Sequence, residues 1–204
     1  LQKPFGRWSR QLLSGKTKRL LLKSYKRREK GMLDYLSVGV VLKPHGLKGE
    51  IKVKPLSDEE RRFDALTCIY LNKEEDYKEL AITARRYDRD FVYLHLEGYC
   101  TVESVEPLRG QYLWIPRKMA RVLPKDTFFI GDLIGCRVWT DAGKFLGTIE
   151  NILRTGSNDV YAVKGSEGEV LIPALKSVVT RVDPSAGRMI VDLSDMKGLL
   201  PDEN

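Results

Sequence analysis

The chain of 204 residues has few cysteines and histidines and no long apolar run. Its three cysteines, Cys68, Cys100 and Cys136, are far apart, so they predict buried, reduced thiols and not a disulfide framework. The longest apolar run near the start, Leu20 to Leu22, is much shorter than the roughly eighteen residues of a membrane span. These absences indicate a protein of the reducing cytoplasm that has no membrane segment.

The sequence also lacks residues that could carry catalysis or hold a metal ion. His45 and His95 have no carboxylate or cysteine at ligand spacing. The segment from Gly46 to Gly49 is too short for a phosphate-binding loop, and Ser157 does not follow the pattern of a nucleophile elbow. We therefore expect no catalytic residue, no metal site and no cofactor, which favours a function in binding.

Acidic residues are nearly absent from residues 1–31, which hold eleven Lys and Arg and one Glu. The net charge of +7 thus divides into +10 for this extension and −3 for residues 32–204, where 24 basic residues meet 27 acidic ones. Three interpretations of the extension stay open: a stretch that is not native to the protein, an arm that binds RNA, and a targeting peptide. Met32, shortly before the first predicted strand, favours the first.

The remaining residues predict an all-β protein that opens on a hairpin. Residues 38–42 form a short apolar run, and residues 50–54 alternate between polar and apolar side chains, as in a strand with one buried face. Pro44 restricts the backbone between them, and Gly46 and Gly49 can adopt the positive φ angles of a tight turn.

Six strands and one helix fit a first small β-barrel at residues 32–116. A linker at 117–126, which Pro116 and Pro124 punctuate, leads to a second small barrel at 127–204. Thr101 is the expected N-cap of the helix. The first barrel has strands at 36–42, 49–54, 67–71, 80–86, 91–96 and 112–115, with the helix at 101–108. The second has strands at 135–140, 144–153, 160–164, 169–172 and 188–193, with turns at 141–143 and 183–187.

Two segments resemble the RimM family of bacterial ribosome maturation factors. The pattern G-x-V-x-x-x-H-G-x-x-G-E-x-x-V at residues 39–53 resembles its N-terminal domain. The stretches D-L-I-G-C-R-V at 132–138, G-T-I at 147–149 and T-G-S-N-D-V at 155–160 resemble its PRC-barrel domain. The resemblance covers residues 36–199 and implies an assembly factor for the head of the 30S ribosomal subunit that assists 16S rRNA processing.

The resemblance also implies a site on the second barrel for a ribosomal protein, the nineteenth of the small subunit (uS19). The family has a Tyr-Tyr pair at the position of Phe128 and Phe129, where this sequence lacks both hydroxyls. These rings lie on opposite sides of an extended chain, so one could anchor the partner while the other plugs the barrel end. Ser157, Asn158 and Asp159 form either a recognition loop or a structural turn.

The resemblance implies that the first barrel approaches the subunit, and there we expect His45, Lys48 and Arg109 to make the contact. The expected partners are uS19 and the free 30S subunit, with the protein acting as a monomer. Whether it also contacts 16S rRNA directly stays open from the sequence. Two other functions stay open from the sequence. One is an enzyme that binds flavin or nucleotide in a six-stranded barrel, and the other is a general RNA-binding protein that acts through the basic extension.

Overall fold

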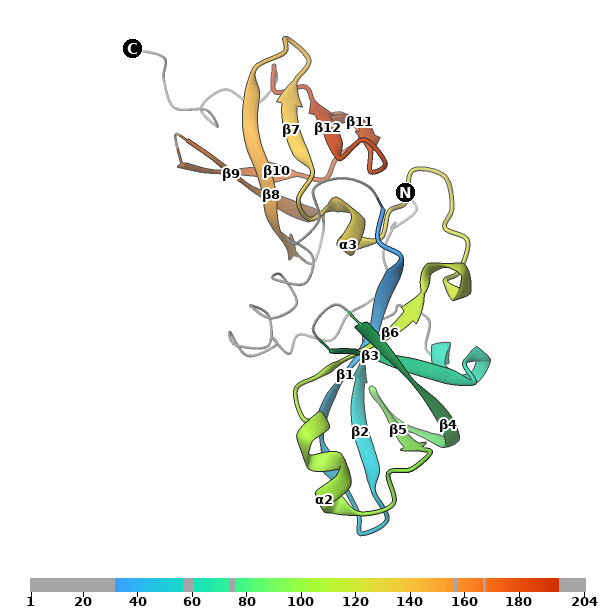
Figure 1. Cartoon of the computed structure of the whole chain (residues 1–204). Helices are drawn as coiled ribbons and strands as arrows, with labels where there is room; N and C mark the ends of the chain where they lie inside the picture. The colour runs from blue at the N-terminus through green and yellow to red at the C-terminus, as the bar shows by residue number, and fades with distance from the viewer. Residues whose placement is uncertain (1–31, 57–60, 74–75, 156–157, 167, 195–204) are drawn as a thin grey trace. The chain divides into compact units, whose positions relative to one another are not determined.

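The computed structural model describes residues 32–56, 61–73, 76–155, 158–166 and 168–194. Their contacts group them into two units, one of residues 34–122 and one of residues 32–33 and 123–194. Both units consist mainly of β-strands, so the all-β class is confirmed (Figure 1). The basic extension lies outside the described residues. No helix in the described ranges is long and apolar enough to cross a membrane.

The first unit is a closed barrel of six strands in the order β1-β2-β5-β4-β3-β6. It closes because β1 pairs with β2 along one edge and with β6 along the other, which leaves no open sheet edge. Its strands are β1 (Tyr35–His45), β2 (Glu50–Pro55), β3 (Cys68–Lys73), β4 (Asp76–Asp88), β5 (Phe91–Leu96) and β6 (Tyr112–Pro116). Its helical turns are η1 (Arg62–Ala65), α2 (Val102–Val105), η2 (Glu106–Leu108) and η3 (Arg117–Met119).

The core of this barrel follows from alternation along the strands. Ile51 and Val53 of β2, and Val92 and Leu94 of β5, have no exposed surface, while the residues between them point outward. Leu113 of β6 is also fully buried. The alternation expected for residues 50–54 is therefore confirmed for residues 50–53, whereas Lys54 is buried and not exposed as expected. The outer face of these strands is available for polar side chains.

The predicted hairpin joins β1 to β2, and its turn needs two glycines for different reasons. Gly46 and Gly49 have φ angles of 63° and 71°. A Cβ atom on Gly46 would meet nothing within 4 Å, whereas one on Gly49 would lie 2.4 Å from the carbonyl oxygen of Tyr99. Gly49 therefore lets the hairpin pack directly on the segment that leads into α2.

The helix after this segment begins where the sequence predicts. Thr101 is its N-cap: the Ser104 amide donates to Thr101 Oγ1 at 3.3 Å, and the Thr101 amide donates to Ser104 Oγ at 3.2 Å. This reciprocal capping box satisfies two amides at the helix start. The predicted helix of residues 101–108 is one turn of α-helix followed by the 3₁₀ turn η2.

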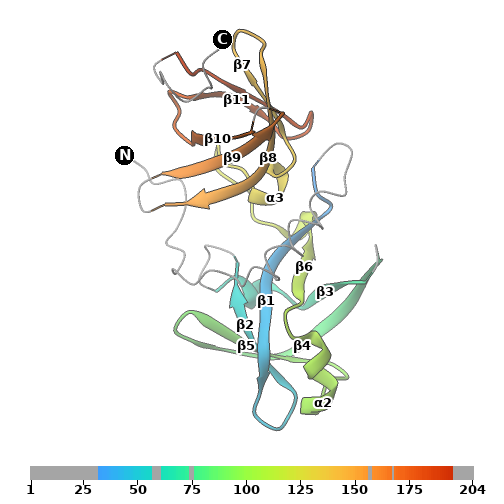
Figure 2. The ribbon, with the colours of Figure 1, turned by 90° about the vertical axis from the view of Figure 1, so that its left-hand side faces the viewer.

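The second unit is a sheet of six strands in the order β10-β9-β8-β7-β12-β11 (Figure 2). Its strands are β7 (Arg137–Thr140), β8 (Phe145–Arg154), β9 (Asp159–Gly165), β10 (Gly168–Pro173), β11 (Val179–Asp183) and β12 (Arg188–Val191), and α3 (Ile130–Leu133) precedes them. All pairs are antiparallel except β7 and β12, which run parallel. Within the described residues the strand pairing does not close this sheet, unlike the expected second barrel. Strand β11 and helix α3 are additions to the predicted elements.

The three cysteines are free thiols, and two of them are buried as expected. Cys68 lies on β3 and Cys136 directly precedes β7. Burial raises the pKa of the Cys136 thiol from 9.0 to about 11, with smaller contributions from Asp132 and Asp183. Cys100 is exposed, so the expectation that all three are buried is wrong. It lies between β5 and α2, where the chain has left the sheet and no longer alternates between core and solvent.

Candidate functional site

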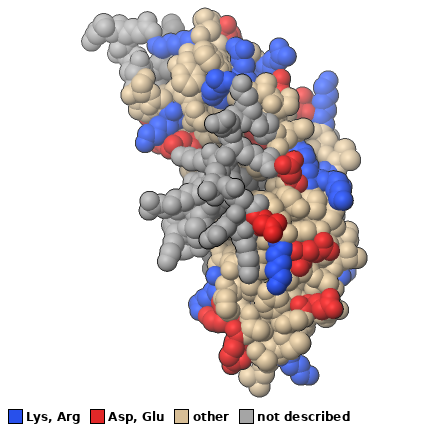
Figure 3. Space-filling view, in the orientation of Figure 1, with Lys and Arg blue, Asp and Glu red and all other residues tan. Residues whose placement is uncertain are grey.

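The outer face of the first barrel carries a row of charged and aromatic side chains that crosses four strands. Lys43 of β1 pairs with Lys52 of β2, Lys52 pairs with Tyr93 of β5, and Tyr93 pairs with Arg86 of β4. Directly opposed residues share a face of the sheet, so these four side chains lie side by side. Positive and negative side chains are interspersed over the face drawn in Figure 3. The distribution of charge on the surface therefore does not reveal this row, and we identify it from the pairing of the strands.

Tyr93 points away from the core, yet only 4% of it is exposed, because cationic and aromatic groups cover its ring. The Arg86 guanidinium lies 3.9 Å from the ring centre and Lys52 Nζ lies 5.7 Å from it. The His45 imidazole meets the ring edge to face, with the centroids 4.6 Å apart. Lys52 Nζ is also 3.8 Å from the centre of the Phe91 ring. Such cation–π contacts hold the positive groups in defined positions.

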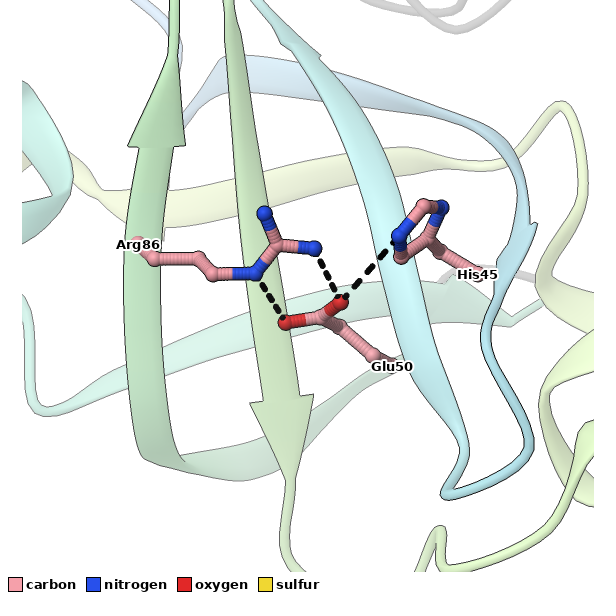
Figure 4. Close-up of polar contacts among 3 residues, drawn as sticks. All are labelled: His45, Glu50 and Arg86. Carbon is pink, nitrogen blue, oxygen red and sulfur yellow. Dashed lines mark hydrogen bonds and ion pairs between the residues drawn. The ribbon is translucent and has the colours of Figure 1, made fainter.

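Glu50 fixes the Arg86 guanidinium in place (Figure 4). Arg86 Nε donates to Glu50 Oε1 at 2.9 Å and Arg86 Nη2 donates to Glu50 Oε2 at 2.6 Å. This two-point bond raises the pKa of Arg86 above its ordinary value. His45 Nε2 lies 3.9 Å from Glu50 Oε2. The Arg86 side chain keeps 49% of its surface exposed, so a planar, positioned cation faces solvent.

The structure brings two of the three predicted subunit contacts together on one hairpin. His45 is the last residue of β1, and Lys48 is exposed in the turn that follows it. Arg109 is exposed after η2, and its Nη1 atom lies 3.4 Å from Glu106 Oε1. Its neighbour Gly110 donates to the Val41 carbonyl at 2.8 Å, so Arg109 lies beside the middle of β1 and not at its end.

Phe128 and Phe129, the predicted site for a ribosomal protein, lie in the irregular segment before α3. Both are half-buried. The Phe129 carbonyl accepts a hydrogen bond from the Asp132 amide at 2.9 Å, which begins the helix. The pair is therefore held by a helix start and not by strand pairing, and each ring has part of its surface in solvent.

The loop between β8 and β9 contains the other predicted contacts. Ser157 lies outside the described residues. Asn158 is exposed, and Asp159 begins β9. The Thr155 hydroxyl donates to the Asn158 carbonyl and accepts from the Asn158 amide at 3.2 Å, so it holds the loop. The sequence analysis named only Ser157, Asn158 and Asp159 for this turn and overlooked Thr155, although threonine hydroxyls often bond backbone groups a few residues away.

Exposed apolar side chains adjoin this loop on one face of the sheet. Leu153 of β8 pairs with Val160 of β9, which pairs with Pro173 of β10. Leu171 lies two residues before Pro173 on β10, so its side chain is on the same face of the sheet. Leu153 and Leu171 are 37% and 44% exposed. An apolar surface beside a polar loop is typical of a site for another protein. The sequence analysis did not identify this surface, because strand pairing alone assembles it.

An exposed aromatic pair, Trp139 and Phe145, lies at the opposite end of β8 from Leu153. Trp139 of β7 pairs with Phe145 of β8, and their ring centroids are 4.9 Å apart. Phe145 is 47% exposed, and the Arg188 guanidinium lies 5.5 Å from the Trp139 ring centre. Within the described ranges, no group of three or more His, Cys, Asp or Glu residues could hold a metal ion.

These features define a two-unit all-β protein whose exposed groups suit binding to other macromolecules. Models of two families match the chain: the RimM N-terminal domain over residues 36–120 and the RimM PRC barrel domain over residues 130–196. The chain therefore belongs to the RimM family.

Two relatives that match by sequence agree with this assignment. The chain is 44% identical to "Ribosome maturation factor RimM" of Acetivibrio thermocellus over 175 residues, which is 84% of this chain and 99% of the relative. It is 39% identical to the protein of the same name from Ruminiclostridium cellulolyticum over 170 residues, 83% of this chain and 99% of that one. A crystal structure titled as the 16S ribosomal RNA processing protein RimM of Pseudomonas aeruginosa is 27% identical, with a TM-score of 0.40 over 78% of this chain and 97% of that chain.

Proposed function

We propose that the protein is a ribosome maturation factor that assists late assembly of the 30S subunit head and processing of 16S rRNA. Family membership over both units is the observation that carries this proposal, since relatives that match almost end to end have that name. The protein works in the cytoplasm as a monomer, by binding and not by catalysis.

In this proposal the second unit binds the ribosomal protein uS19. Phe128 and Phe129 provide apolar contact, and Ser157, Asn158 and Asp159 provide polar contact. The half-burial of both rings supports this role, because each can pack on its own unit and still present an edge to a partner. The exposed Leu153 and Leu171 extend the surface beside the loop. Interfaces of this kind combine an apolar centre with a polar rim.

The first barrel, in turn, faces the free 30S subunit and 16S rRNA through His45, Lys48 and Arg109. The exposure of all three residues supports this orientation. The hairpin that carries His45 and Lys48 is braced by Gly49 against the segment before α2, so it presents these side chains from a fixed support. A preorganised surface loses less conformational entropy on binding.

Sedimentation tests the proposal. The full chain is incubated with separated 30S subunits and with intact 70S ribosomes, and each mixture is centrifuged through sucrose. We expect the chain to travel with 30S subunits and to stay behind when 70S ribosomes are offered. Phe145→Ala is the matched control for Phe128→Ala and Phe129→Ala, since it removes an exposed ring of the second unit outside the proposed site. Equal binding to both particles contradicts a role in assembly.

A further inference from the structure

The row of Lys43, Lys52, Tyr93 and Arg86 contains positive charge that the barrel itself leaves without ionic partners. Lys43 and Lys52, and Lys48 in the adjacent turn, make no ion pair with any described residue. Lys43 and Lys48 are exposed, and Lys52 is half-buried against Phe91. This local excess stands out because residues 32–204 have a net charge of −3.

Carboxylates on the same face do not cancel the excess. Glu50 is bonded to Arg86, and Asp88 is exposed opposite Phe91. The turn between β4 and β5 adds an exposed carboxylate, Asp90, and an exposed cation, Arg89. Lys43, Lys48, Lys52 and Arg86 therefore still outnumber the carboxylates Glu50, Asp88 and Asp90. Adjacent strands are about 4.8 Å apart, so the row places cations at successive positions across the sheet. Groups spaced in this way can each meet a different phosphate of a nucleic acid strand.

Arg86 adds a flat group to this charged row. One side of its guanidinium lies over Tyr93 at 3.9 Å, its edge is bound by Glu50, and the side chain remains 49% exposed. Nucleobases stack on guanidinium planes as well as on aromatic rings. An acidic protein would pair with the lysines and with the edge of a guanidinium, but Glu50 already binds that edge of Arg86, so its exposed flat face is what remains for a ligand.

We propose that the outer face of β1, β2, β5 and β4 binds single-stranded RNA. Lys43 and Lys52 contact phosphates, and a base stacks on the exposed side of Arg86. His45 lies beside this base position, at the edge of the Tyr93 ring. The inference deepens the proposed function and rests on it for the source of the RNA, which would be the 30S subunit.

Fluorescence anisotropy of the full chain with a labelled single-stranded RNA of about twelve nucleotides, within the range covered by one small barrel, tests the surface. Titrations at several salt concentrations compare the wild type with three variants. Lys43→Gln combined with Lys52→Gln removes the phosphate contacts, and Arg86→Lys keeps the charge but removes the flat group. Lys78→Gln is the matched control, since it removes an exposed cation elsewhere on β4. The basic extension is the same in all of them.

The two kinds of contact predict different results. Each phosphate contact to a single strand contributes about 0.7 to the slope of log affinity against log salt, so the double lysine variant should lose about 1.4. Arg86→Lys should weaken binding about tenfold at each salt concentration and leave the slope unchanged, because the charge stays while the flat group on which a base stacks is lost. Lys78→Gln should bind like the wild type.

Other results would overturn the inference. Wild-type affinity in both the double lysine variant and Arg86→Lys means that this face does not bind RNA. A slope loss of about 0.7 in Lys78→Gln, the share of one of the two lysines, means that general charge and not a site is responsible. If the double lysine variant loses binding to polyglutamate but not to RNA, the face binds an acidic protein instead. Melting curves of the variants show whether each one is folded.

The same variants separate this inference from the proposed function. If the wild type binds the oligonucleotide through this face but does not sediment with 30S subunits, the surface is right and the proposed function is wrong. If the wild type sediments with 30S subunits, and the double lysine variant and Arg86→Lys do so equally well and bind RNA normally, the proposed function stands and the RNA surface is wrong.

Discussion

Replacing each glycine of the β1–β2 turn by alanine tests whether close backbone packing holds this hairpin in place. Both Gly46→Ala and Gly49→Ala put a side chain at a positive φ angle, 63° and 71°. Only Gly49→Ala also forces atoms together. Its Cβ atom would lie 2.4 Å from the Tyr99 oxygen and 2.9 Å from backbone atoms of Cys100 and Thr101, whereas Gly46 has open space.

The expected costs differ because the two variants share only one source of strain. A left-handed backbone angle at a residue with a Cβ atom costs roughly 1–2 kcal/mol. Overpacking in a tightly packed region adds about 1–3 kcal/mol, and backbone atoms cannot move aside as a flexible side chain can. Gly46→Ala should therefore lose about 1–2 kcal/mol of the free energy of unfolding, and Gly49→Ala about 2–5 kcal/mol.

The free cysteines supply a separate measure for each unit. Alkylation of the native protein, followed by mass spectrometry of its peptides, reports how often the buried Cys68 and Cys136 become exposed. Cys68 should react about 5 to 150 times faster in Gly49→Ala than in Gly46→Ala, which corresponds to about 1–3 kcal/mol. Cys136, in the other unit, is the internal control and should react equally in both. Equal rates at Cys68 in the two variants would refute the packing argument.

Three further predictions concern other parts of the chain. Thr101→Ala should cost about 1 kcal/mol of first-unit stability in urea, and Thr101→Ser should cost much less, because only serine retains a capping hydroxyl. The second unit should lose stability between about pH 9 and pH 12. Burial raises the pKa of Cys136 from 9.0 to about 11 and the pKa of Tyr161 from 10.0 to about 12. The unfolded chain therefore releases these protons at a lower pH than the folded chain does, which favours unfolding as the pH rises. Cys136→Ala should reduce this loss in urea titrations, and an unchanged pH profile would contradict the assignment. Of Phe128→Ala and Phe129→Ala, one variant should melt normally and bind uS19 about thirtyfold more weakly, a loss of about 2 kcal/mol of binding free energy. The other variant should melt at a lower temperature than the wild type. Normal melting and full binding in both variants would place the site elsewhere.

Local chemistry made part of the fold predictable from the sequence. The positive φ angles of Gly46 and Gly49 and the N-cap role of Thr101 depend on residues close in the chain, and all three predictions are confirmed. Strand β11 was not predicted because its pairing with β12 shifts between Val179 and Arg181, which interrupts the alternation that identifies a strand. Its exposed and half-buried residues also give little hydrophobic signal.

The candidate site was less predictable, because its parts come from distant strands. Glu50 and Arg86 are 36 positions apart, and only the register of β2, β5 and β4 brings them together. His45 and Lys48 could be found because they adjoin a recognisable turn, but the covered ring of Tyr93 gives no signal of its own in the sequence. The apolar surface around Leu153 and Leu171 was likewise hidden, since each leucine alone is an ordinary strand residue.

The parallel pair in the second sheet affects the order in which the chain can fold during its synthesis. Arg188 of β12 pairs with Arg137 of β7, so this contact closes a separation of 51 positions. Long-range pairing of this kind forms slowly, and it must wait until β12 has been made. The first barrel needs no residue beyond β6, which pairs with β1, to complete its ring of strands. The first barrel can therefore acquire its structure on the translating ribosome while β7 still lacks its parallel neighbour.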